Sequence, residues 1–83
     1  MDWPFDVFVQ HPPRRIAGVA EIVGERNGSW EIGQIYVRND EGAVRHADVA
    51  ERRDVSLSLF MLASTAIGRA YRKTMERGND HHR

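Results

Sequence analysis

Residues 16–38, with the sequence IAGVAEIVGERNGSWEIGQIYVR, decide the fold. The dipeptide Asn27-Gly28 stands between two apolar segments of this stretch. Both central residues of a type I′ turn have positive φ, which Asn and Gly tolerate best. We therefore expect strands at about 16–26 and 29–38, joined by a tight hairpin turn.

A two-residue turn also fixes which residues of the two strands lie opposite each other. The expected pairs are Val19 with Tyr36, Val23 with Ile32, and Glu25 with Trp30. One face then collects Ile16, Gly18, Ala20, Ile22, Gly24, Gly33, Ile35 and Val37. It is apolar and low in relief, so a helix can lie close against it. The other face mixes apolar and acidic side chains, and we expect the N-terminal arm or a partner to cover it in part.

Two weaker strand patterns flank the hairpin. Residues 5–10 alternate loosely between apolar and polar, and the His-Pro-Pro run at 11–13 ends this segment. Because proline cannot donate to a ladder, we place this strand at a sheet edge. Turn residues at 39–42 lead into a candidate third strand at 43–47.

A long helix is predicted at 48–78, ending at a Gly-Asn C-cap. Asp48 and Glu51 have capping-box spacing, whereas Asp54 is a second candidate N-cap. Either one helix begins near Asp48, or a short turn precedes a main helix that begins at Val55. At the i, i+3, i+4 spacing of a helix, one stripe collects Leu57, Phe60, Met61, Ser64, Gly68, Tyr71 and Met75.

Further apolar residues surround this stripe, and they widen it almost around the helix: Leu59, Leu62, Ala63, Ala66, Ile67 and Ala70. One face of a hairpin cannot cover a helix that is apolar on nearly every side. The N-terminal strand, a second copy of the chain or a target must cover the remainder.

The expected fold is a single α+β domain over residues 1–83, in which an antiparallel β-hairpin or three-stranded sheet packs on one long C-terminal helix. Its expected parts are an N-terminal arm or edge strand (1–15), the hairpin and possible third strand (16–47), the helix (48–78) and a frayed tail (79–83). A chain of 83 residues has room for one core and is marginally stable. Disulfides and thiolate metal sites are excluded, because the sequence has no cysteine.

Twelve basic and twelve acidic residues cancel, so no global charge attracts nucleic acid or a membrane. No basic stretch leads into an apolar run at the N-terminus, as it would in a secretory signal. The most apolar segment, 55–67, is shorter than the roughly 20 residues that a bilayer span needs. We expect a cytoplasmic protein.

The sequence contains no phosphate-binding loop, zinc-ligand pair or nucleophile elbow. His46, Asp48 and His11 could in principle form a site, but a strand-edge histidine beside a helix cap is the better explanation of the first two. The adjacent His81 and His82 lie in the predicted tail. We expect no enzyme activity, no metal and no cofactor.

The candidate partner-binding residues are Trp30, Tyr36, Arg69, Arg72, Lys73 and Arg77. Aromatic residues and arginine are enriched in interface hot spots, although a small domain also needs its large side chains in the core. The basic residues near the end of the helix either contact phosphate or an acidic surface, or complement the helix dipole.

In size and architecture the chain resembles the small hairpin-plus-helix proteins of prophages and mobile elements, a group that includes the anti-CRISPR proteins. The Asn27-Gly28 hairpin, the strand from Trp30 to Val37 and the Arg-rich helix end carry this resemblance. It implies a non-catalytic inhibitor that docks on a host defence protein or complex, and it matches no family motif. The alternative is a small nucleic-acid-binding regulator, dimeric through the helix.

Overall fold

The computed structural model describes residues 1–10, 12–24 and 29–80, with side chains described as far as Met75. The Asn27-Gly28 turn, Glu25, His11, His81 and His82 therefore lie outside the described residues. The elements in chain order are β1 (Asp2–Gln10), β2 (Pro13–Gly24), β3 (Trp30–Arg38), β4 (Val44–His46), α1 (Val49–Leu62) and α2 (Ser64–Asp80).

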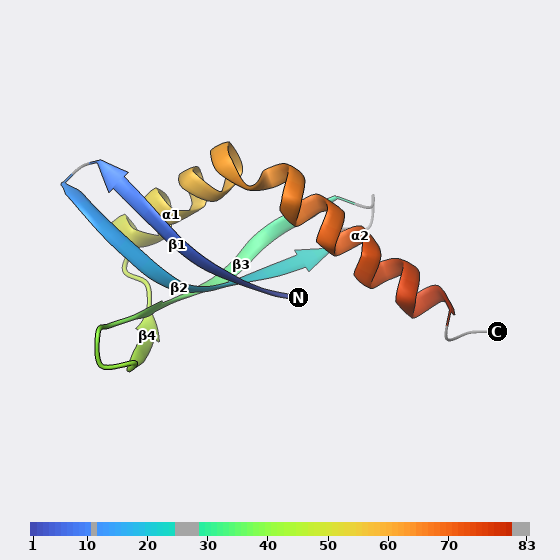
Figure 1. The fold of residues 1–83 in the computed structure, drawn as a ribbon, viewed down its shortest axis with the longest axis horizontal. Coiled ribbons are helices and arrows are strands. Elements are labelled where there is room, and N and C mark those ends of the chain that lie inside the picture. Colours follow the sequence, from blue (N-terminus) through green and yellow to red (C-terminus); the bar gives the residue numbers. More distant parts are fainter. Residues whose placement is uncertain (11, 25–28, 81–83) are drawn as a thin grey trace.

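The four strands form one antiparallel sheet in the order β1-β2-β3-β4. Both helices lie on the same side of this sheet, and α2 runs on past its end (Figure 1). The buried core residues of the sheet are Phe5, Val9, Ile16, Ala20, Ile22, Ile35 and Val37. Val55, Leu59 and Ile67 complete the core from the helices. The expected α+β class and the antiparallel hairpin are confirmed, whereas the sheet has four strands instead of two or three.

The prolines of β1 and β2 fit the ladder between these two strands. Met1 and Ile22 exchange two backbone hydrogen bonds, 3.0 and 2.7 Å long. Hydrogen-bonded and non-hydrogen-bonded pairs alternate along an antiparallel ladder. The register from the Met1–Ile22 pair to the end of the ladder is uninterrupted, so every second pair is non-hydrogen-bonded. Pro4 opposite Val19 and Pro13 opposite Gln10 are both non-hydrogen-bonded pairs. Their missing N–H groups therefore cost the ladder no bond, and β1 is an edge strand as expected.

A β-bulge interrupts the pairing of β2 with β3. Val19 lies opposite Tyr36 as predicted, but Ile32 lies opposite Ile22 and Trp30 opposite Gly24. The predicted pairs Val23–Ile32 and Glu25–Trp30 are wrong because Gly33 and Gln34 of β3 together face the single residue Glu21 of β2. Because of the extra residue, the side chains of residues 30–32 point to the opposite faces of the sheet from those predicted.

The bulge is bonded to α1 on one side and to β2 on the other. Nη1 of Arg52 donates to the backbone oxygen of Gly33 at 2.5 Å. The backbone N–H of Gln34 donates to Oε1 of Glu21 at 3.4 Å. A Cβ on Gly33 would meet the carboxylate of Glu21, so a larger residue here would displace that side chain. Arg14 of β2 adds a second link to α1 through Asp54, at 3.1 Å.

The C-terminal segment forms two helices, and the predicted single helix is wrong. The first begins after the N-cap Asp48, whose capping box with Glu51 is complete, so the helix starts near Asp48 and not at Val55. Ala63, with φ −128° and ψ 2°, separates α1 from α2. The break changes the helix direction where the chain crosses a twisted sheet, which a straight helix of roughly 45 Å could not follow. The second helix continues to Asp80, beyond the predicted Gly-Asn cap.

Candidate protein-binding surface

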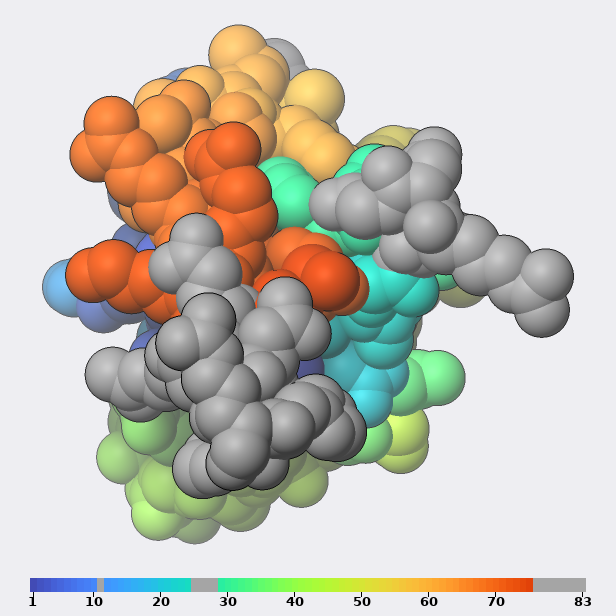
Figure 2. Space-filling model, turned by 90° about the vertical axis from the view of Figure 1, so that its right-hand side faces the viewer, coloured from blue at the N-terminus to red at the C-terminus, as the bar shows by residue number. Residues whose placement is uncertain are grey.

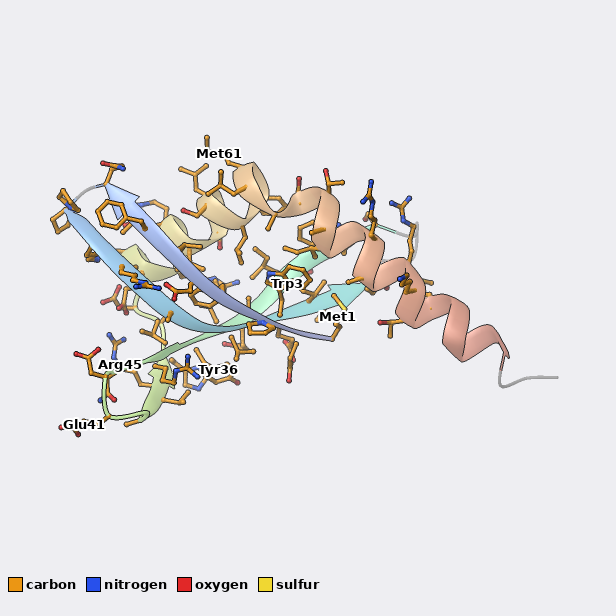
Figure 3. All side chains as sticks on the ribbon, in the orientation of Figure 1. Met1, Trp3, Tyr36, Glu41, Arg45 and Met61 are labelled. Carbon is orange, nitrogen blue, oxygen red and sulfur yellow. The ribbon has the colours of Figure 1, made fainter. Side chains whose placement is uncertain are left out.

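Four large apolar side chains in the C-terminal half of α1 are exposed. They are Leu57 (59% exposed), Phe60 (48%), Met61 (73%) and Leu62 (78%), and we call them the apolar ridge. Met61 points away from the sheet in Figure 3. Single exposed apolar residues are ordinary, but a contiguous group is typical of interaction sites.

The sequence left open which side of the helix the sheet covers, and in the structure Leu57, Phe60 and Met61 of the predicted stripe are exposed. The face that packs on the sheet instead carries Val55 and Leu59. Both faces satisfy helical spacing, so periodicity alone could not choose between them. The exposed face also contains Ser64 and Gly68, which fill a core poorly, and that difference was the available clue.

A groove lies between the start of β3 and the helices, next to the ridge. Trp30 stacks on Phe60, with ring centroids 5.2 Å apart and an interplanar angle of 11°. These rings line a hollow of about 530 Å³ together with Tyr71, Gly68 and Arg72. We call this hollow the aromatic groove. Figure 2 views the molecule from this end, with α1 and α2 in orange and red above most of the sheet.

Gly68 opens the floor of the aromatic groove. A Cβ at this position would lie 3.5 Å from Nε1 of Trp30, which is an ordinary contact. Gly24, opposite Trp30 in the ladder, has a related role, because a side chain there would collide with the Tyr71 hydroxyl. Two glycines thus leave room for the aromatic side chains of the groove.

The bulge separates the two predicted aromatic binding residues. It turns Trp30 to the helix side of the sheet, where it reaches Phe60. Tyr36 lies on the opposite face, where its ring is 4.8 Å from that of His46. Figure 3 shows Met61 and Tyr36 on opposite sides of the sheet. Trp30 and Tyr36 therefore do not form one surface.

Three basic side chains of α2 lie beside the aromatic groove. Arg69, Arg72 and Lys73 are exposed, and none makes a hydrogen bond or ion pair with any residue that the structure describes. Their spacing places them on one side of the helix. The helix extends to Asp80, so they precede its last turn, within which the dipole acts. Arg77 stands in that turn, with its side chain outside the described part.

A second hollow, of about 390 Å³, lies where β2, β3 and β4 meet the start of α1. Three of the four arginines that line it are in ion pairs: Arg14 with Asp54, Arg15 with Asp6, and Arg45 with Glu51. Hydrogen bonds from Arg15 hold the pKa of Asp6 below its ordinary value. Hydrogen bonds from Arg45 lower the pKa of Glu51 to about 2. These ion pairs have a structural role.

The residues considered for catalysis have other contacts. His46 packs on Tyr36, and Asp48 caps α1 by accepting from the Glu51 N–H at 2.8 Å. Within residues 1–10, 12–24 and 29–80, no group of three His, Cys, Asp or Glu side chains could hold a metal ion. The geometry thus gives His46 and Asp48 separate structural contacts.

No protein-family model, curated protein or solved structure matches the chain. Neither described helix is long and apolar enough to cross a membrane. The candidate site therefore rests on geometry: an apolar ridge, an aromatic groove, and three basic side chains with no described partner.

Proposed function

We propose that the protein is a non-catalytic protein-binding module that docks through the apolar ridge and the adjoining aromatic groove. The observation that carries this proposal is the exposure of Leu57 and Met61, the helical neighbours of Phe60, next to the Trp30–Phe60 stack. The exposed side chains are part of α1, a helix fixed to the sheet, so a partner meets a preformed surface.

The energetics favour such a contact. Complete burial of one large apolar side chain contributes about 1.5–3 kcal/mol, and the ridge offers four that are between 48% and 78% exposed. Several kcal/mol are therefore available to offset the loss of freedom on association. Trp30 and Arg72 add residue types that are enriched in hot spots.

The proposed partner is a host protein or complex. The resemblance to small phage and mobile-element proteins of the anti-CRISPR type makes a CRISPR-type defence complex the first partner to test. The proposed role is inhibition by docking, and it needs no chemistry from this chain.

The test compares Leu57→Asp and Met61→Asp with the control Val44→Asp. Val44 is equally apolar and exposed, but it lies on β4. Each tagged variant is incubated with host lysate, and captured proteins are quantified by mass spectrometry. We expect both ridge variants to lose a partner that the wild type and the control retain, with circular dichroism unchanged. Equal capture by all four proteins would contradict the proposal.

The second candidate is a dimeric nucleic-acid-binding regulator, favoured by the exposed Arg69, Arg72 and Lys73 next to aromatic rings. Phosphate contacts from these side chains would make binding weaken steeply with salt. Light scattering at two protein concentrations tests for the dimer, and a DNA or RNA mobility shift at low salt tests for binding. A monomer that shifts no probe would remove this candidate.

A further inference from the structure

The aromatic groove offers hydrogen-bond donors to a ligand. The Trp30 indole N–H lies 3.5 Å from the position that a Gly68 Cβ would take, and it has no acceptor among the described residues. Arg72 lines the same groove and can only donate. A ligand with acceptor oxygens would satisfy both groups.

Three described basic side chains lie beside the groove. Arg69, Arg72 and Lys73 are exposed and have no ion-pair partner in the described part of the chain, whereas Arg14, Arg15 and Arg45 all contact carboxylates. The complementary occupant is anionic. Guanidinium groups bind carboxylates in charge-assisted hydrogen bonds, stronger than those between neutral groups.

We infer that the aromatic groove binds an acidic segment of the partner protein, with an apolar side chain against Trp30 and Phe60 and carboxylates at Arg72 and its neighbours. This inference rests on the proposed function and adds the chemistry of the partner. The groove continues into the apolar ridge, which a polypeptide with its own apolar side chains can cover. Aliphatic side chains such as Met61 and Leu62 are best covered by other aliphatic or aromatic side chains of a protein, whereas nucleic-acid bases mainly stack on aromatic rings.

The probe is a display library of short random peptides, selected on the immobilised full chain. We expect the enriched sequences to carry several Asp or Glu around one aromatic or aliphatic residue. Synthetic labelled copies are then measured in solution by fluorescence anisotropy. Arg72→Glu should weaken their binding about 10-fold or more, while the control Arg38→Glu, with the same charge change on β3, should alter it less than about 2-fold. Phe60→Ala should weaken binding to a similar degree.

Enriched peptides that are neutral or basic, or whose affinity Arg72→Glu leaves unchanged, would overturn the inference. So would a selection without enrichment, or tighter binding of a single-stranded oligonucleotide than of any acidic peptide. These failures are separable from failure of the proposed function, because capture of a whole partner depends on Leu57 and Met61 and is measured independently. If that capture persists without acidic-peptide binding, only the inference is wrong.

Discussion

Substitution of Glu51 by Gln tests how α1 is anchored. The Glu51 carboxylate accepts hydrogen bonds from Arg45 at 2.6 and 2.8 Å and from the Asp48 N–H at 3.0 Å. These bonds lower its pKa from 4.5 to about 2, the largest contribution coming from Arg45. Gln retains an oxygen for the Asp48 N–H but loses the charge that Arg45 meets. Its NH2 group also replaces an oxygen that accepts from Arg45, so the substitution removes the charge and one hydrogen bond of this contact together.

The magnitude follows from the pKa. A shift of this size corresponds to about 3 kcal/mol if fully expressed. Arg45 is 59% exposed, although Glu51 is only 13% exposed, so solvent screens the pair and we expect about 1–2 kcal/mol. Since the folded-state pKa of Glu51 lies below the unfolded value, this stability is fully present above about pH 5. It is lost as the pH falls through the folded-state pKa of about 2.

Urea unfolding followed by circular dichroism, from neutral pH down to the acid limit of folding, measures the free energy of unfolding of both proteins. We expect Glu51→Gln to be less stable by about 1–2 kcal/mol at neutral pH, and the difference to shrink steadily below pH 5. Glu41→Gln, in the exposed turn before β4, is the matched control and should show a small difference at every pH. A difference between wild type and Glu51→Gln that is independent of pH would refute the reasoning.

Three further substitutions test the groove and the bulge. Gly68→Ala should raise the free energy of unfolding by about 0.5–1 kcal/mol, because glycine is unfavourable inside a helix. The new methyl group would meet Trp30 at an ordinary contact distance, and a lower melting temperature than that of the wild type would contradict this. Arg52→Ala removes the hydrogen bond to the Gly33 oxygen and should lower the free energy of unfolding by about 1 kcal/mol. Arg53→Ala should lower it less, because the Asp54 oxygen that Arg53 contacts is 3.5 Å away. Equal urea midpoints of the two variants would contradict this prediction. Tyr36→Ala should leave capture of the partner unchanged, because Tyr36 lies on the opposite face from the ridge; lost capture would place the binding surface there.

Local sequence rules predicted the elements that depend on neighbouring residues alone. Alternation and turn residues were sufficient for β2 and β3, and the capping-box spacing of Asp48 and Glu51 correctly gave one possible start of α1. The apolar face from Ile16 to Ile22 is buried as expected. Each of these features is set by one strand or one helix end, with no information from elsewhere in the chain.

The features that were predicted wrongly depend on several elements at once. At the bulge of Gly33 and Gln34, the backbone oxygen of Gly33 accepts a hydrogen bond from Arg52, which lies nineteen residues further along the chain. A glycine inside a strand is a recognised sign of a bulge, but it does not say which side chains change face. Trp30 was therefore placed on the wrong side of the sheet. The break at Ala63 could not be predicted from the residue type, because alanine favours helix. It is also a mild break, since Ala63 still donates a backbone hydrogen bond to Leu59 and accepts one from Ile67.

The ion pairs show how charge is distributed over the molecule. The chain is neutral overall, so no global charge attracts nucleic acid or a membrane, but residues 43–83 carry eight basic against five acidic residues. The acidic groups Asp6, Glu51 and Asp54, however, are bound to arginines of β2, β4 and α1. Beyond about 8 Å exposed charges are screened at physiological salt, so carboxylates paired elsewhere cannot neutralise α2. The molecule is 49 Å long and α2 runs past the end of the sheet (Figure 1). Arg69, Arg72 and Lys73 thus place three exposed positive charges at this end of the molecule, beside the groove proposed to bind an acidic segment.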